Sequence, residues 1–343
     1  MERHYRVIFP IGHGGMAFEQ IENYSILYDC GSSSSPARIE MYIDMLKNQG
    51  IQHIDYLFIS HFDQDHVNGL NALLNSKIYV RHAVISYIPQ MYRGVFDFVM
   101  KGAYNVIRNL IRRLEGQIIE IGEERENGVR GRRFQIPFWE WIAESMLRND
   151  DFDKLHNEFT QRGIDVAQLS DVMYIERRKE DINNAFKKVF GPQGPNAKGL
   201  IVLSQKSQDV QLIHAKLQNA ICCCPPYRPQ RDLSAFSQNT GCLYVGDTRI
   251  KTTIEVNGIN DFLHQYLVGD QLLLMQLPHH GSMYNINDDL HNQISADVYF
   301  IHDNTDKRIR RSHQLYSTLT ATNKLYVVKD ICSDLILGIC EIQ

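Results

Sequence analysis

The stretch Ser60-His61-Phe62-Asp63-Gln64-Asp65-His66 decides the fold, because it places two histidines and two aspartates within six consecutive positions. It directly follows residues 54–59, an apolar run that favours a buried strand ending in a turn. Aspartate is rarely buried unless it is paired with another charge or bound to a cation. Imidazole and carboxylate groups are both common ligands of divalent metals. The turn therefore predicts a metal site with ligands His61, Asp63, Asp65 and His66.

The size and composition are those of an ordinary globular protein. The chain has 343 residues and a mass of 39.7 kDa, enough for one large domain or for a core domain with a sizeable insertion. Hydrophobic residues make up 43% and charged residues 22%. The net charge of −4 gives no strong global attraction for nucleic acid, so a polyanion would need a local basic patch.

The termini and the cysteines indicate a reducing compartment. The first residues are polar and no apolar run is long enough to span a bilayer, so we expect neither a secretory signal nor a membrane partner. The seven cysteines are an odd number, and three of them are consecutive. Neither fact is typical of a disulfide framework. We therefore expect a cytoplasmic protein with reduced thiols.

The pattern along the chain predicts an α/β frame interrupted by a helical insertion. Strands are expected near residues 5–11, 24–29, 54–60, 199–203, 210–213, 241–245, 272–277, 298–301 and 325–328. Between them, residues 91–196 show several amphipathic helical stripes, and we expect this stretch to form a helical insertion within a single domain spanning residues 1–343. Trp139 and Trp141 are expected to pack inside that insertion.

Three of the later strands are also followed by candidate ligands. Asp247 follows one strand, His279 and His280 follow the next, and His313 lies beyond a third. Open α/β sheets bind ligands at the carboxyl ends of their strands. Brought to one such edge, these side chains would complete a site for two metal ions together with the first turn.

At these residues the chain resembles the metallo-β-lactamase-fold hydrolases. The run from Ser60 to Leu70 resembles their signature, and it is closest to the branch typified by the hydrolase domain of the competence protein ComEC, which has an aspartate where most members have a second histidine. Gly246-Asp247 and the run 278–282, Pro-His-His-Gly-Ser, are similar to two further motifs of that branch. The resemblance covers residues 5–85 and 197–343 and implies an αββα sandwich.

The resemblance also implies a division of the ligands between two ions. His61 and Asp63 would hold one ion, Asp65 and His66 the other, and Asp247 would bridge both. One of the two neighbouring histidines, His279 or His280, would complete the second ion's shell. The additional histidine that most of the superfamily supplies to the first ion has no match here. The oxygen-rich ligand set leaves Zn²⁺, Mn²⁺ and Mg²⁺ open.

A pair of cations suggests hydrolysis of a phosphodiester. Two cations about 3.5–4 Å apart can lower the pKa of a water molecule and neutralise an anionic transition state. Asp63 or Asp65 could orient the nucleophile, and a protonated His280 or His313 could help the leaving oxygen depart. Arg310, Arg311 and His313 are candidates for binding substrate phosphate. The substrate would be a nucleic acid or a nucleotide-derived molecule.

Two alternatives remain open from the sequence. The same pair of metals could hydrolyse an acyl or lactam bond. In a third hypothesis the chain is a non-catalytic module whose helical insertion binds a protein partner, and the missing ligand of the first ion favours it. The retained cluster of two histidines and two aspartates favours an enzyme, because a site without metal has no need to keep carboxylates together.

Overall fold

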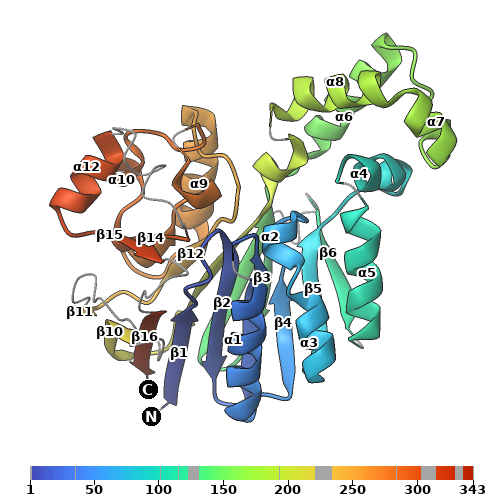
Figure 1. The fold of residues 1–343 in the computed structure, drawn as a ribbon. Coiled ribbons are helices and arrows are strands. Elements are labelled where there is room, and N and C mark those ends of the chain that lie inside the picture. Colours follow the sequence, from blue (N-terminus) through green and yellow to red (C-terminus); the bar gives the residue numbers. More distant parts are fainter. Residues whose placement is uncertain are drawn as a thin grey trace.

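Two β-sheets packed face to face form the centre of the molecule. The computed structural model describes residues 2–34, 36–100, 102–114, 116–122, 131–192, 194–220, 234–282, 284–302, 314–328 and 335–342. Within these residues, helices cover the outer face of each sheet (Figure 1). The α/β class and the αββα sandwich predicted from the sequence are therefore confirmed.

The first sheet contains nine strands in the described part of the chain. From edge to edge they are β11 (Ser234–Ser237), β10 (Leu212–Ala220), β16 (Leu335–Ile342), β1 (Glu2–Ile8), β2 (Gly14–Ile21), β3 (Tyr24–Ser32), β4 (His53–Phe58), β5 (Tyr79–Ser86) and β6 (Gln117–Ile121). Strands β3 to β6 are parallel, and the neighbours from β11 to β3 are antiparallel. The carboxyl ends of β3 and β4 therefore meet at one edge.

The second sheet contains seven strands in the same described residues. Their spatial order is β15 (Leu325–Val328), β14 (Ala296–His302), β13 (Leu272–Gln276), β12 (Cys242–Tyr244), β9 (Leu200–Lys206), β8 (Trp139–Ser145) and β7 (Arg132–Gln135). Strands β12 to β15 are parallel, so their carboxyl ends also lie together. These ends carry the later motifs of the sequence.

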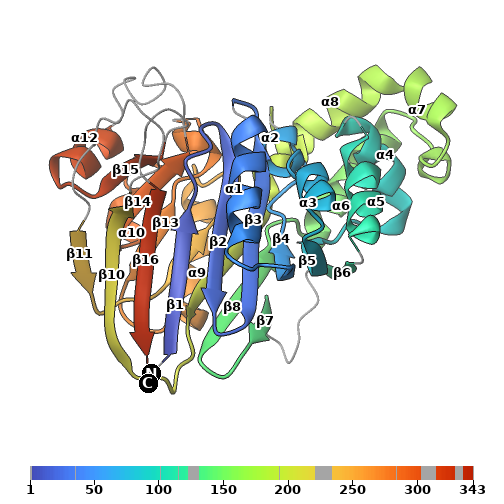
Figure 2. The same cartoon turned by 60° about the horizontal axis from the view of Figure 1, so that its bottom comes forward.

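The helices fall into three groups. The first sheet is covered by α1 (Pro36–Asn48), α2 (Gln64–Val67), α3 (Leu70–Ser76) and α5 (Ala103–Arg113), and the second by α9 (Thr253–Tyr266), α10 (Leu290–Gln293) and α12 (Gln314–Ala321) (Figures 1 and 2). A third group at one end of the sandwich contains α4 (Arg93–Val99), α6 (Asn149–Gln161), α7 (Val172–Arg177) and α8 (Lys179–Phe190). Single 3₁₀ turns are η1 (Gln90–Tyr92), η2 (Val166–Gln168), η3 (Gly194–Lys198) and η4 (His279–Gly281).

The alternation of side chains along the strands builds separate hydrophobic cores. On β4, Leu57 packs beneath the helices of the first sheet, whereas its neighbour Phe58 packs between the two sheets. On β9, Leu203 likewise packs toward the outer helices and Val202 between the sheets. Both faces of these strands are buried, which explains their nearly continuous apolar sequences.

A buried ion pair lies between the two sheets. Arg6 on β1 and Glu19 on β2 are direct cross-strand neighbours, and the Arg6 Nε donates a hydrogen bond to Glu19 Oε1 at 2.7 Å. The Glu19 carboxylate also accepts hydrogen bonds from Trp141 Nε1 at 2.8 Å and Tyr244 Oη at 2.7 Å. Partners from both sheets thus satisfy one buried charge, and they fix how the sheets face each other.

The helical insertion predicted for residues 91–196 needs a correction. Three strands lie within this range: β6 closes an edge of the first sheet, and β7 and β8 extend the second. Trp139 and Trp141 lie on β8 and are fully buried between the sheets, not among the helices. The physical reason is the alternation of Trp139, Trp141 and Ala143, a period of two that is typical of strands.

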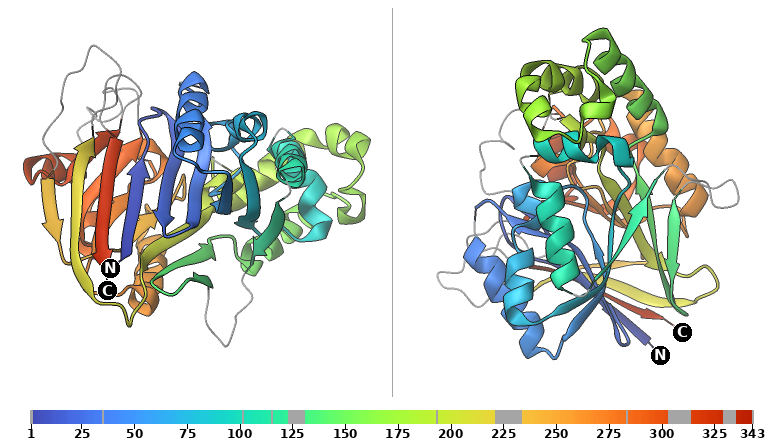
Figure 3. Two further views of the ribbon diagram at one scale, coloured as in Figure 1. Left: turned by 90° about the horizontal axis from the view of Figure 1, so that it is seen from below. Right: turned by 90° about the vertical axis from the view of Figure 1, so that its right-hand side faces the viewer.

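Two further features complete the frame. The first and last described strands, β1 and β16, pair antiparallel, so the two ends of the chain lie side by side (Figure 3). None of the described helices combines the length and the apolar character that crossing a bilayer requires.

Candidate metal centre

The motif turn lies where strand β4 ends at the edge between the two sheets. Residues 59–63 leave the strand, and Asp63 begins the short helix α2 with an extended backbone, φ −70° and ψ 148°. His61 and His66 are buried, whereas the side chain of Asp63 is 47% exposed. The turn thus presents two buried imidazoles and one accessible carboxylate at the same edge.

Four buried polar atoms converge at this edge without a hydrogen-bond partner among the described residues. They are the Nε2 atoms of His61, His66 and His280, and Oδ1 of Asp247. A buried polar atom without a partner costs free energy, about 1–3 kcal/mol each. Atoms of this kind that face one another point to a group bound between them. The donor set, imidazole nitrogens with a carboxylate oxygen, fits divalent cations.

The separations between these atoms fit ligands of a common cation better than they fit hydrogen bonds. His66 Nε2 lies 3.5 Å from Asp247 Oδ1, and His61 Nε2 lies 3.7 Å from Asp247 Oδ2. His280 Nε2 lies 3.6 Å from Asp247 Oδ1. Bonds of about 2.0–2.2 Å from a tetrahedral cation would place two ligand atoms roughly 3.3–3.6 Å apart. The residues present therefore fit metal ions.

Asp29 and Ser60 hold the first two histidines in the orientation that a metal needs. The fully buried Asp29 accepts hydrogen bonds from Ser60 Oγ at 2.7 Å and from His66 Nδ1 at 2.7 Å, both at Oδ2. Ser60 Oγ gives its only proton to Asp29, so it accepts from His61 Nδ1, which lies 2.9 Å away. In its neutral form each of the two histidines therefore carries its proton on Nδ1 and turns an unprotonated Nε2 toward the site.

The two histidines of the Pro-His-His-Gly-Ser run have different surroundings. His280 is buried, and its Nδ1 donates to the backbone carbonyl of His302 at 3.1 Å, so its Nε2 also faces the site, 3.2 Å from Asp65 Oδ2. The side chain of His279 is 29% exposed, and its Nδ1 donates to Asp247 Oδ2 at 2.7 Å. This geometry favours His280 as a ligand and His279 as a residue that positions Asp247.

The charges at the site balance one another. Burial alone would raise the pKa of Asp247, but the surrounding His280 and His61 hold it well below its ordinary value. Burial and the neighbouring His66 lower the pKa of His61. Burial would also lower the pKa of His66, but Asp29 raises it well above its ordinary value. Asp29, with a smaller contribution from Asp247, thus favours the protonated form of His66.

The structure divides the ligand atoms into two groups, which differ in part from the division implied by the resemblance. His61, His66 and Asp247 form one group, and His13, Asp65 and His280 form the other, each with ligand atoms within 4.8 Å of one another. Asp63 belongs to neither group, although its Oδ2 lies 3.9 Å from His61 Nε2. Arg310, Arg311 and His313 lie outside the described residues.

Sequence reasoning missed two participants. Asp29 is the last residue of the strand expected at residues 24–29, and its role as the partner of His66 emerges only from the fold. His13, on the turn between β1 and β2, was assigned no role. The only signal for either residue was its place in a polar, glycine-containing turn directly beside a predicted strand.

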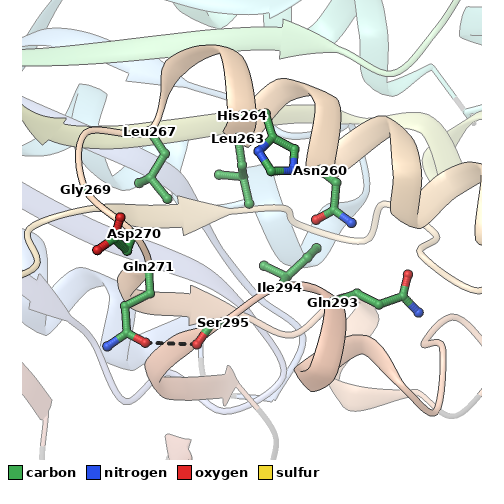
Figure 4. A pocket seen from close by; sticks show the side chains of 10 residues that line it. All are labelled: Asn260, Leu263, His264, Leu267, Gly269, Asp270, Gln271, Gln293, Ile294 and Ser295. Carbon is green, nitrogen blue, oxygen red and sulfur yellow. Dashed lines mark hydrogen bonds between the residues drawn. The ribbon is translucent and has the colours of Figure 1, made fainter.

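A cavity elsewhere in the molecule lacks this chemistry. It measures 280 Å³ and lies between α9, the loop before β13, and the end of α10, where a hydrogen bond joins Ser295 Oγ to Gln271 Oε1 (Figure 4). Among the described residues, the two groups of side chains that could hold a metal both lie at the motif edge and not in this cavity.

Comparisons with known proteins find one family model and several solved structures that are similar to parts of this chain. Residues 18–142 match the model of the metallo-beta-lactamase superfamily. No curated protein sequence matches the chain. Three solved structures are similar to it: a diphosphatase of the PhnP family, the metallo-beta-lactamase fold protein YhfI from Bacillus subtilis, and the short form of human tRNase Z.

The structural likeness to these three proteins is distant. For the PhnP-family diphosphatase the TM-score is 0.43 and the identity 9%, over 96% of this chain and 95% of the other. For YhfI the values are 0.46 and 9%, over 98% and 100%, and for tRNase Z they are 0.41 and 10%, over 88% and 94%. These values support no statement about activity. The segment that matches the family model includes the whole motif turn, and the αββα sandwich that contains it is consistent with the metallo-beta-lactamase fold.

Proposed function

We propose that this protein is a metal-dependent hydrolase that cleaves a phosphodiester in a nucleic acid or in a nucleotide-derived molecule. The observation that carries the proposal is the convergence of four buried polar atoms without hydrogen-bond partners among the described residues. Each of the three histidines involved turns Nε2 to the same place because Nδ1 is already used. That arrangement is typical of metal ligands and has no benefit for packing.

The chain would hold two divalent ions, with Zn²⁺, Mn²⁺ and Mg²⁺ as the candidates. His61 and Asp63 would bind one ion, Asp65, His66 and His280 the other, and Asp247 both. Asp247 is suited to bridging because each of its oxygens faces a different histidine, Oδ2 toward His61 and Oδ1 toward His66.

The bound ions would supply Lewis acidity, an activated water molecule and charge for an anionic transition state. The chain's own residues would do the rest. Asp63, whose side chain is 47% exposed beside His61, would accept the proton of the attacking water at Oδ2. His280 has one nitrogen bound to the His302 carbonyl and the other turned to the ligands, so its geometry leaves no nitrogen for the leaving group.

The choice of a phosphodiester follows from charge. A phosphodiester is anionic and repels nucleophiles in water, so a pair of cations accelerates its cleavage more than that of a neutral bond. We also propose that the chain lies on the ComEC-like branch, supported by Asp63 at the position where most of the superfamily has a second histidine.

A chromogenic substrate tests the proposal. Metal-free protein would be assayed with bis(p-nitrophenyl) phosphate after addition of Mn²⁺ or Zn²⁺, beside Asp65→Asn and the control Asp288→Asn. Asp288 is a suitable control because its side chain is 55% exposed, lies 3.8 Å from Lys251 Nζ, and belongs to neither ligand group. We expect metal-dependent turnover that is lost in Asp65→Asn and kept in Asp288→Asn.

Two outcomes would contradict the proposal. Equal and negligible turnover in wild type and in Asp65→Asn, despite bound metal, would favour a non-catalytic binding module. Turnover of an acyl ester or a lactam, without turnover of the phosphodiester, would favour the acyl hydrolase alternative.

A further inference from the structure

His13 reaches the edge of the metal centre from the turn between β1 and β2. Its Nε2 lies 3.6 Å from Asp65 Oδ2, and its ring lies against that of His280, with centroids 3.7 Å apart and planes inclined by 35°. With Asp65 and His280 it forms a group whose ligand atoms all lie within 4.8 Å of one another. Its side chain is 23% exposed, so it closes the group on the solvent side.

The backbone around His13 packs closely against the motif turn that contains Asp65. A Cβ atom on Gly14 would lie 2.5 Å from the backbone oxygen of Asp65, so only glycine allows the two turns to approach so closely. The His13 backbone is also fixed, because its N–H donates to Ser34 Oγ at 2.8 Å and its carbonyl accepts from the Ser33 N–H at 2.9 Å. The position of His13 is therefore set before any ligand binds.

A histidine near a carboxylate can be a simple surface pair, and the chain provides one for comparison. His53 Nε2 lies 3.6 Å from Asp55 Oδ1, and its side chain is 34% exposed. The pair at His13 differs in having a third member: His280 is 95% buried, and its Nε2 has no hydrogen-bond partner among the described residues although Asp65 Oδ2 is 3.2 Å away. That atom faces the other ligand atoms of the group instead of a hydrogen-bond partner.

We propose that His13 is a ligand of the cation that Asp65 and His280 hold. This inference depends on the proposed function only in requiring divalent cations at the site. The added imidazole would make this position richer in nitrogen than the one formed by His61, Asp63 and Asp247. Imidazole ligands suit Zn²⁺ more than Mg²⁺ or Mn²⁺. The two positions would then differ in affinity and in metal preference, with the His13 position the tighter one for zinc.

Metal titration of His13→Gln tests the inference without an activity assay. Metal-free wild type, His13→Gln and the matched control His53→Gln would be titrated with Zn²⁺ against a competing chelator, and with Co²⁺ followed by visible absorption. We expect His13→Gln to lose at least about tenfold in affinity for one of two equivalents, since even an outer partner of a ligand is worth 10–100-fold. Its Co²⁺ spectrum should change, and His53→Gln should match wild type.

The outcomes separate the two proposals. If wild type binds two equivalents and His13→Gln binds both equally well with an unchanged Co²⁺ spectrum, His13 is no ligand and the proposed function stands. If wild type binds no divalent cation, the proposed function fails as well. Metal-free His13→Gln should unfold at the same urea concentration as metal-free wild type. A lower urea midpoint, together with an equal loss of metal affinity at both metal positions, would overturn the inference and indicate a structural role for His13.

Discussion

Replacement of Asp29 by asparagine would test how the chain prepares the metal centre. Asp29 is fully buried and has a left-handed backbone, with φ 50°. Asparagine tolerates this conformation at least as well as aspartate does, so Asp29→Asn changes the charge without adding backbone strain. The carbonyl oxygen of the new amide can still accept from the Ser60 N–H, which lies 2.8 Å from Asp29 Oδ1.

The loss occurs at the other oxygen, Oδ2, which accepts from His66 Nδ1 at 2.7 Å. There the NH₂ of the amide would face the N–H of His66, so that two donors oppose each other. An unpaired buried donor costs about 1–3 kcal/mol. Loss of an outer partner of a histidine ligand lowers metal affinity roughly 10–100-fold, or about 1.4–2.7 kcal/mol. The two magnitudes agree, so we expect Asp29→Asn to bind one cation 10–100-fold more weakly.

The pH dependence of this loss has a definite sign. Asp29 raises the pKa of His66 against the opposing effect of burial, so in the wild type His66 must release a proton before it binds a cation. In Asp29→Asn that proton is held less tightly. The difference in affinity should therefore be largest in alkaline buffer, where wild-type His66 is already neutral, and should narrow as the pH falls.

Competition with a chelator measures both effects, and Asp55→Asn is the control. Asp55 is also a buried carboxylate, and it accepts from the Ser25 N–H at 2.8 Å and from Arg81 Nη1 at 2.7 Å, but it lies at the opposite end of β4 from the motif turn. Asp55→Asn should lower stability and leave metal affinity unchanged. Equal metal affinity in wild type and Asp29→Asn in alkaline buffer would refute the reasoning.

Three further predictions concern stability, close packing and protons. Glu19→Gln should lower the free energy of unfolding by about 3–5 kcal/mol, because it leaves the buried guanidinium of Arg6 without its carboxylate partner. Glu341→Gln, in an ion pair whose arginine is 58% exposed, should lower it by less than about 1 kcal/mol, and urea titrations giving similar losses would contradict this. Gly15→Ala would place a Cβ atom 2.8 Å from His66 Nδ1, so it should weaken metal binding. Gly258→Ala is the control, because the atom nearest to its added Cβ lies 4.0 Å away. Competition with a chelator would compare the metal affinities of the two variants with that of wild type. Zn²⁺ binding near neutral pH should release a proton from His66. Calorimetry in buffers of different ionisation enthalpy would measure the number of protons released. A Zn²⁺ affinity that does not change with pH would exclude this proton release.

The sequence predicts the frame because the strands leading to the ligands are long apolar runs. The run before His61 is found as β4, and the runs before Asp247 and His279 are found as β12 and β13. Parallel strands of this kind bring their carboxyl ends together, so motifs that are far apart in the sequence can be expected at one edge. The order of the strands within each sheet comes from the structure, and it brings these carboxyl ends to the same edge.

The parts that the sequence does not predict are polar residues whose partners are distant in the chain. The sequence predicts only a turn at Gly12-His13-Gly14-Gly15. No local pattern indicates that strand β2 begins within this turn or that His13 lies beside Asp65. Asp29 similarly acquires its role only when β3 and β4 pair. Such roles depend on tertiary contacts, and a single sequence has no local signal for them.

The metal centre also concentrates backbone strain, which separates a built site from a chance cluster of polar groups. Asp29, His279 and His280 all have positive φ, at 50°, 47° and 51°. A left-handed backbone costs a non-glycine residue about 1–3 kcal/mol and persists only where surrounding contacts impose it. Here the contacts are the hydrogen bonds of the same side chains: Asp29 to His66, His279 to Asp247, and His280 to a backbone carbonyl. In a fold selected for stability alone, relaxed turns would satisfy these groups at lower cost. The strained arrangement is explained if the orientation of each Nε2 and of the Asp247 carboxylate matters more than the stability that the turns give up.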